Sequence, residues 1–413
     1  MKKIIYNLKA YLVVMLAAMF LLTSCNKDLE QLAPITVPAY PTGTGVAATL
    51  AANANYSFYS AMITRSGLTA SLNDLTKTFT LFATDNNGMK LFCNALGVPS
   101  GSPDAVYLGF ISTTLPAASA AGIVQYNTIG QKFPLASIGN SFPNYPITTQ
   151  IILDPTQPFV RMNIFPVRGT ISYVNNLPLV ATDMAAANGI IHTAYSVAAP
   201  PSATLKTMIA AEPTLSYFRA AVARADSGSV GLSRFDSLMN YGVTNMTVLA
   251  PNDAAFQTLV FGLVYSQVFA ATGNAALATA TANGAVAAGP AFLSTNNVST
   301  ALMRGIVAYH LLASLTTSTT TPYQPNIRVF SNNIPSTPGF FIKTLVNGSI
   351  GAHPGVMAQA TYAGPAVTSV KFSSYGSFPP GGAPFSYFAT SLTLDKLAVN
   401  GVYHIIDKVL LPQ

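Results

Sequence analysis

The sequence predicts an α+β protein in which one domain occurs twice, and three observations support this prediction. Three sequence blocks recur in the same order in both halves of the 413-residue chain. The first block of each half is followed by apolar residues at helical spacing. The last block alternates residues between two faces that are both largely apolar. We therefore expect each copy to combine helices with strands that are covered on both sides.

The first 24 residues resemble a bacterial lipoprotein signal peptide. Lys2, Lys3 and Lys9 precede an apolar run at 12–22 that is too short to span a hydrocarbon core. Residues 22–25, Leu-Thr-Ser-Cys, resemble a lipobox, in which the thiol of Cys25 receives diacylglycerol before cleavage. The alternative is an ordinary secretory peptide with a chance cysteine. Two or three acyl chains on Cys25 would bind membrane lipid stably.

Residues 25–46 are predicted to form an extended tether, because prolines and glycines alternate there without apolar periodicity. Lys27 with the nearby acids Asp28 and Glu30 resembles the export signal of surface lipoproteins in Bacteroidota. This resemblance implies lipid anchoring at the cell outer membrane, facing outside. The alternatives are the periplasmic face and a tether whose charges are merely solvated.

The composition limits the classes of partner. Half of the residues are apolar and only 8% are charged, so the surface must consist mainly of uncharged polar groups. The formal net charge of +7 falls to +4 once the three lysines of the signal are removed, and no Lys/Arg cluster occurs. We expect no nucleic-acid partner. Because Cys25 carries lipid, Cys93 has no cysteine with which to form an intrachain disulfide.

The repeat places two domains at 47–201 and 202–413. The paired blocks are 80–89 with 247–256, 123–127 with 306–310, and 188–197 with 400–409. In the second copy, residues 247–250 are predicted to form a buried strand, and Asn252 to cap a helix. That helix carries Phe256, Leu259 and Val260 on one face, and Asp85 caps its counterpart in the first copy.

Two further elements follow from local patterns in the second copy. Pro213 stands where a first helical turn tolerates proline, and Leu215, Phe218, Ala221 and Val222 then form an apolar stripe that we expect in the core. Residues 400–401, Asn-Gly, are predicted to form a turn with positive φ before the terminal strand.

The second copy is longer, mainly through insertions near 275–297 and 314–386. The later insertion alternates prolines with aromatic residues, among them Phe330, Phe340, Phe341, Tyr375 and Tyr387. Two interpretations stay open: a sugar- or peptide-binding surface, or strands and hairpins of an enlarged domain. No stretch after the signal is expected to have the length and unbroken apolarity of a membrane span, and the longest candidate is 275–293.

The blocks of the second copy resemble the motifs of the fasciclin-domain family. Residues 247–256 resemble its first signature, Tyr309-His310 its central motif, and 400–412 its closing strand. The first copy departs from the pattern, with Asn127 in place of His310 and Tyr195 in place of Asp407. The resemblance implies that each domain is a wedge-shaped β-sandwich with several packed α-helices.

The same resemblance implies roles for particular residues. Asn252, Asn400, Gly401, His404 and Asp407 are expected to be structural. Tyr309 and His310 are the candidate partner contacts, although the helical spacing of Tyr309 from Leu302 and Ile306 also predicts that Tyr309 points inward.

Fasciclin domains are chiefly adhesion modules, so the resemblance implies adhesion to an extracellular protein or polysaccharide. The alternatives are an accessory glycan-capture lipoprotein that feeds an outer-membrane transporter, and a structural spacer without a ligand. We expect no enzyme activity and no cofactor, because no nucleophile elbow, zinc-protease motif or phosphate-binding loop occurs. We also expect no metal site, because His310, His353, His404 and Asp407 lack ligand spacing.

Overall fold

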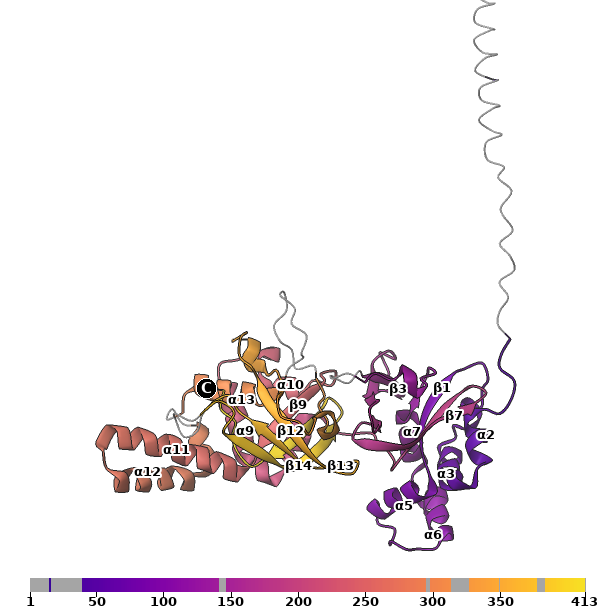
Figure 1. The fold of residues 1–413 in the computed structure, drawn as a ribbon, viewed down its shortest axis with the longest axis horizontal. Helices are drawn as coiled ribbons and strands as arrows, with labels where there is room; N and C mark the ends of the chain where they lie inside the picture. The colour runs from indigo at the N-terminus through magenta and orange to yellow at the C-terminus, as the bar shows by residue number, and fades with distance from the viewer. Residues whose placement is uncertain are drawn as a thin grey trace, which may run out of the picture. The chain divides into compact units, whose positions relative to one another are not determined.

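The computed structural model describes Met15 and residues 39–140, 146–294, 298–312, 327–348, 350–376 and 383–412 (Figure 1). Two units are distinguished, Met1–Pro41 and the compact unit Thr42–Gln413. The predicted lipidation residue Cys25 and nearly all of the predicted signal and tether lie outside the described residues. Folded structure begins at the end of the predicted tether, since Val46 is fully buried. The hydrophobic clusters that the described residues form all lie within Thr42–Gln413.

In the first domain, some helices precede the first strand in the sequence and others follow it. The helices are α2 (Val46–Ala51), α3 (Ser57–Ser66), α4 (Thr69–Leu72), α5 (Asn86–Ala95), α6 (Asp104–Gly109), a π-helix (Phe110–Thr114) and α7 (Ala117–Tyr126), with short 3-10 turns at Ala54–Tyr56 and Leu135–Ser137. The strands are β1 (Phe79–Thr84), β2 (Thr128–Ile129), β3 (Ile147–Ile152), β4 (Arg161–Ile164), β5 (Pro166–Val167), β6 (Tyr173–Val174), β7 (Leu177–Ala186) and β8 (Gly189–Ala194).

The second domain repeats this order with additions. Its helices are α8 (Leu205–Ala211), α9 (Ser216–Ala225), α10 (Phe235–Asn240), α11 (Asp253–Thr272), α12 (Ala275–Ala287) and α13 (Thr300–Tyr309), with 3-10 turns at Pro213–Leu215, Gly231–Ser233, Gly289–Ser294, Ser331–Asn333 and Leu345–Gly348. Its strands are β9 (Met246–Pro251), β10 (Leu311–Leu312), β11 (Phe340–Ile342), β12 (Val356–Ala363), β13 (Ala366–Ser373), β14 (Phe388–Ala398) and β15 (Gly401–Ile406).

The strand pairing shows that the two domains are copies of one another. The eight strands of the first run β4-β3-β2-β1-β8-β7-β6-β5, and the seven of the second run β10-β9-β15-β14-β13-β12-β11. In each domain the first strand pairs in parallel with the last and antiparallel with a two-residue strand. Phe82 lies opposite His192 and Leu249 opposite His404, so the register is also repeated. The predicted α+β class and the internal duplication are confirmed.

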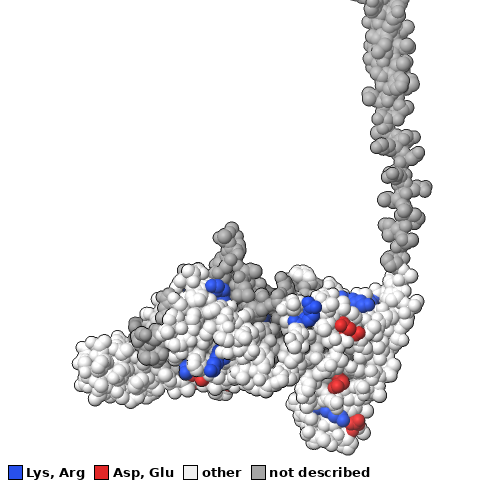
Figure 2. Space-filling view, in the orientation of Figure 1, with Lys and Arg blue, Asp and Glu red and all other residues white. Residues whose placement is uncertain are grey.

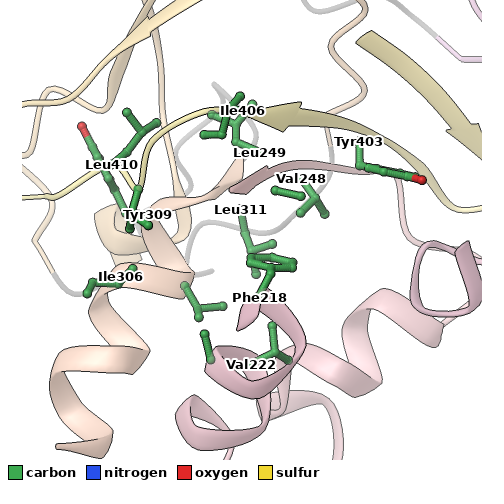
Figure 3. Packing of buried hydrophobic residues seen from close by; sticks show 14 of the residues in the cluster. Phe218, Val222, Val248, Leu249, Ile306, Tyr309, Leu311, Tyr403, Ile406 and Leu410 are labelled. Atoms are coloured by element: carbon green, nitrogen blue, oxygen red, sulfur yellow. The ribbon is translucent and has the colours of Figure 1, made fainter. Parts of the chain in front are cut away.

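Each domain has its own hydrophobic core, in which helices pack on the central strands. Figure 3 shows Phe218 and Val222 of α9 beside Val248 of β9 in the second domain. Every residue of β1, β8, β9 and β15 is buried, as expected for strands that are covered on both faces. The predicted stripe on α9 is confirmed, because Phe218 and Ala221 have no exposed surface and Val222 has 4%.

The predicted helix caps are also confirmed. The Asn252 side chain accepts a hydrogen bond from the Ala255 backbone N–H at 2.9 Å and begins α11. Asp85 begins α5 in the same way, by accepting from the Gly88 N–H at 2.8 Å. These caps satisfy backbone donors that a helix N-terminus leaves free.

The predicted reason for Gly401 is wrong. Neither Asn400 nor Gly401 is among the described residues with positive φ. Glycine is required there because a Cβ atom would lie 2.2 Å from the Met246 carbonyl oxygen of the neighbouring strand. Gly189 is required for the same reason, because a Cβ atom there would lie 2.4 Å from the Phe79 carbonyl oxygen. The glycine therefore permits close packing of two backbones rather than an unusual turn.

The later insertion in the second domain builds part of the sheet. Its described residues form β11, β12 and β13, which continue the sheet beyond β14. Its aromatic side chains divide between core and surface: Phe330 is fully buried, whereas Phe341 is 41% exposed. The described part of the insertion thus forms strands and hairpins, as one of the two interpretations expects. The other interpretation, a binding surface, stays a prediction, because some of its aromatic side chains are exposed.

The earlier insertion forms a helical hairpin with α11, which is 20 residues long. The expectation that no stretch after the signal has the properties of a membrane span is wrong for α11. This helix is long and apolar enough to cross a membrane, with a mean hydropathy of 1.4 in its most apolar window.

Candidate functional site: an exposed aromatic cluster

The structure places the two predicted partner contacts, Tyr309 and His310, inside the core of the second domain. Tyr309 has no exposed surface and His310 has 1%. Tyr309 is among the buried side chains labelled in Figure 3. Both residues lie at the C-terminal end of α13, whose buried face also carries Met303 and Ile306. A partner that binds the folded surface does not reach these side chains. This corrects the predicted contact and confirms that Tyr309 points inward.

His310 links the end of α13 to the end of the chain. Its Nδ1 donates to the Ile306 carbonyl at 2.8 Å, and its Nε2 accepts from the Leu410 backbone N–H at 3.0 Å. This network fixes a neutral imidazole with its proton on Nδ1. Burial lowers the pKa of His310 to about 4, although the hydrogen bond to Ile306 acts in the opposite direction.

His404 is a second buried imidazole, and it has a counterpart in the first domain. The Asp395 backbone N–H donates to His404 Nδ1 at 3.2 Å, and His404 Nε2 donates to the Val329 carbonyl at 3.0 Å. In the first domain, the Asp183 backbone N–H donates to His192 Nδ1 in the same way, at 3.3 Å. Burial lowers the pKa of His404 and of His192. The predicted structural role of His404 is consistent with this geometry.

The aspartates of these two contacts were not identified from the sequence. Asp183 and Asp395 adopt positive φ values of 62° and 56°, at bulges in β7 and β14. In both copies the aspartate stands nine residues before the histidine that it contacts, and this shared spacing is visible in the sequence. A pairwise alignment of the two copies would have found it.

Asn400 and Asp407 hold backbone segments of the second domain in place. The Asn400 side chain accepts from the Leu205 N–H at 2.8 Å and donates to the carbonyls of Met239 and Tyr241 at 2.9 and 3.0 Å. Asp407 accepts from the Thr390 N–H at 2.6 Å. Both contacts fit the structural roles that the sequence predicted.

A cluster of exposed aromatic rings lies on the surface of the second domain. We define the aromatic cluster as Phe341 of β11, Tyr375 after β13, and Phe385 before β14. The Phe341 and Phe385 ring centroids are 5.2 Å apart at an interplanar angle of 70°, and those of Tyr375 and Phe385 are 5.7 Å apart at 58°. Phe341 is 41% exposed and Tyr375 36%, and Phe385 is partly exposed. The three rings therefore form an angled apolar surface open to solvent.

Buried groups beneath the aromatic cluster hold Tyr375 in position. The Tyr309 hydroxyl donates to the Gly355 carbonyl at 2.7 Å and accepts from the Tyr375 N–H at 3.0 Å. The His353 ring lies between the two tyrosines, edge-to-face to both, at centroid distances of 5.2 and 5.3 Å. Burial raises the pKa of Tyr309 well above its ordinary value, so it stays a hydroxyl. Tyr309 thus supports the exposed surface from within the core.

Two lysines lie over aromatic rings at the same end of β13 and β14. Lys371 Nζ is 4.7 Å from the centroid of the Phe388 ring, and Lys408 Nζ is 5.0 Å from it. Phe388 pairs with Ser373, two residues before Tyr375. Across the described ranges neither lysine forms an ion pair. Their ammonium groups are therefore available as hydrogen-bond donors to oxygen atoms of a ligand.

The sequence pointed to Phe341 and Tyr375 as aromatic residues of an insertion but did not single out Phe385. Phe385 follows the run at 379–384, which is rich in proline and glycine, and has a φ of 61°. Its ring contacts both of its partners. The sequence predicts no role for His353, which the structure places between Tyr309 and Tyr375. In the part of the chain that the structure describes, no three His, Cys, Asp or Glu side chains gather where a metal ion would bind.

The first domain contains an apolar cavity of about 700 Å³. It lies between α5, the π-helix and α7, and Phe92, Leu96, Phe110, Leu115 and Ile123 are among its lining residues. None of the described residues that line it has a titratable side chain. It thus offers shape and apolar surface without groups for acid–base chemistry.

No protein-family model and no curated protein matches the chain. Among solved structures, the chain is similar to a FAS1 domain pair from the insect cell adhesion molecule fasciclin I. The two share 12% sequence identity and a TM-score of 0.31, over 86% of this chain and 96% of that chain.

Proposed function

We propose that this protein is a lipid-anchored adhesion protein of the bacterial outer membrane, with two fasciclin-like domains that face outside. The aromatic cluster of Phe341, Tyr375 and Phe385 carries the proposal, because it is a preorganised apolar surface supported from the core. We propose that it binds an extracellular polysaccharide. The protein binds this partner without chemical turnover and without a cofactor.

The size and charge of the surface favour a polysaccharide over a protein partner. A stable protein interface covers about 800 Å² on each partner. Three partly exposed rings provide much less, but they suit a few sugar rings, whose apolar faces stack on aromatic side chains. Ligand hydroxyl groups can accept hydrogen bonds from Lys371 and Lys408, whose ammonium groups lie over the Phe388 ring at the start of β14. A repeating polymer also gains avidity when several anchored copies bind it together.

Replacing Phe341 or Tyr375 with alanine is expected to weaken polysaccharide binding by about tenfold or more, because each change removes a large apolar contact. Binding to glycan and matrix-protein arrays measures the effect. Point variants are preferable to deletion of 314–386, since that segment contains three strands of the sheet. Tyr241→Ala is the matched control, because Tyr241 is 48% exposed and lies outside the cluster. Equal binding by all variants would contradict the proposed site.

Anchoring is tested by Cys25→Ser, which removes the thiol that lipid would modify. We expect the protein to move from the membrane fraction to the soluble fraction, since the acyl chains supply the stable attachment. Mass spectrometry of the wild-type amino terminus is expected to show an acylated cysteine. An unmodified terminus would refute the anchor and leave the polysaccharide site to be judged separately.

A second candidate function is glycan capture for an outer-membrane transporter. The exposed rings of the insertion also favour this hypothesis, because a capture protein presents such rings to a soluble oligosaccharide. Cells that lack the protein would then take up the oligosaccharide more slowly. If they instead lose attachment to the polysaccharide, adhesion is the function. If neither changes and no array ligand binds, the protein is a spacer.

A further inference from the structure

The helical hairpin of α11 and α12 extends away from the sheet of the second domain (Figure 1). The first turns of α11 pack in the core of the second domain, where Phe256 and Val260 are fully buried and Leu259 is 5% exposed. Beyond Val260 no side chain of α11 is fully buried. On α12, Ala278 and Ala282 are buried. The hairpin is thus fixed at one end and exposed at the other.

The composition of this hairpin is unusual for an exposed element. From Ala254 to Met303 the sequence contains no Asp, Glu, Lys, Arg or His. Figure 2 shows the region of α11 and α12 free of charged residues on the visible face. Only 22% of the most apolar window of α11 is buried, so its apolar character is not explained by packing in a core. A surface of this kind suits a partner that excludes charge.

The serine and threonine hydroxyls of the hairpin are satisfied within its own helices. All five Ser and Thr hydroxyls of the two helices donate to carbonyls in their own helix: Thr258, Ser266, Thr272, Thr279 and Thr281. At the turn, the Gly273 N–H donates to the Phe269 carbonyl at 2.8 Å, and Asn274 caps α12. Such internal pairing lowers the cost of moving the hairpin tip out of water.

Two large apolar side chains flank the turn. Phe269 is 44% exposed and Leu277 is 48% exposed. Phe269 ends a ladder of stacked rings with Tyr265 and Phe261, with centroids 5.8 and 5.9 Å apart. From the exposed Gln267 to the end of α11 the tip is about 8 Å long, at about 1.5 Å per residue. Interfacial helices insert about 5–10 Å into the headgroup boundary.

We propose that the tip of this hairpin, with Phe269 and Leu277 at its centre, inserts into the outer leaflet of a lipid bilayer. A lipid surface is favoured over a second copy of the chain because, apart from Leu277, the side chains that α12 presents to solvent are mainly Ala and Thr. Two small faces of that kind bury far less than the roughly 1,000 Å² that a specific interface needs. The contact is independent of Cys25 and of the polysaccharide site.

Phe269→Trp provides a direct test, because the protein contains no tryptophan. The fragment 42–413 is suitable, since it holds every hydrophobic cluster and lacks the apolar N-terminal segment. Vesicles of phosphatidylethanolamine and phosphatidylglycerol are expected to shift its emission to the blue, and brominated lipids to quench it. An unchanged spectrum would overturn the proposal. A shift that depends on protein concentration without lipid would identify self-association and overturn it as well.

Flotation with the same vesicles tests the two side chains together. Phe269→Asp combined with Leu277→Asp is expected to reduce the bound fraction by about a hundredfold, because each change replaces an inserted apolar group with a charge. Phe159→Asp is the control, since Phe159 is 77% exposed in the first domain. Circular dichroism confirms the fold of each variant. If the double variant floats like the wild type, or the control loses binding equally, the tip is not the contact.

Discussion

Replacing Asn400 with leucine is expected to destabilise the second domain by about 4 kcal/mol. The side chain is fully buried and bonds the Leu205 N–H and the carbonyls of Met239 and Tyr241. Leucine is similar in size but leaves these three backbone groups without their partner. Each buried group that loses its hydrogen bond costs about 1–3 kcal/mol. Denaturant unfolding followed by circular dichroism measures the loss.

Two other asparagines serve as controls for this prediction. Asn188→Leu is expected to have the same effect on the first domain, because Asn188 accepts from the Val46 N–H and donates to the carbonyls of Leu72 and Asp74. Asn240→Leu should change the stability by less than about 1 kcal/mol, since Asn240 is exposed and the hydrogen bond that its side chain accepts from the Thr204 hydroxyl is exposed as well. If Asn400→Leu lowers the free energy of unfolding no more than Asn240→Leu does, the hydrogen bonds of Asn400 contribute little to stability.

Acidification from pH 6.5 to pH 4 is expected to remove about 3 kcal/mol of stability through His310 alone. Burial lowers its folded pKa to about 4, from about 6.5 in the unfolded chain. Because the folded pKa is the lower one, the unfolded chain binds the proton first as the pH falls. The contribution is therefore complete above pH 6.5 and is lost as the pH approaches 4. His404 and His192 act in the same direction.

The variant His310→Asn isolates this effect, since the first domain has Asn127 at the same position. The Asn127 amide donates to the carbonyls of Ile123 and Ala198 at 2.9 and 2.8 Å and does not titrate in this range. We expect the unfolding free energy of the variant to fall less than that of the wild type between pH 6.5 and 4, by about 3 kcal/mol. Parallel pH profiles for the two proteins would mean that His310 becomes protonated without unfolding.

Several parts of the fold were predictable because they depend on local sequence. The caps at Asn252 and Asp85, the apolar stripe of α9 and the doubly buried terminal strand all follow from residues within about ten positions of one another. The pairing of distant backbones was not predictable in this way. The sequence identified Gly401, but its reason, the approach of the Met246 carbonyl, becomes visible only when the parallel register of β9 and β15 is known.

The candidate site was predictable only in part. Insertion 314–386 was recognised as aromatic, yet nothing in it separates Phe330, which is fully buried, from Phe341, which is 41% exposed. The family resemblance makes Tyr309 a candidate partner contact. The structure shows instead that its buried hydroxyl accepts a hydrogen bond from the Tyr375 backbone N–H. Its inward direction did follow from helical spacing.

By itself the sequence determined the duplication, the helices and strands that repeat in each copy, and the expectation of a lipid anchor, because repeats, caps and periodic apolar patterns are local properties. The tertiary structure decided which aromatic rings form the exposed cluster and that α11 leaves the core to build an uncharged hairpin. Exposure depends on whether segments distant in the chain cover a side chain, and that covering is a property of the packed domain as a whole.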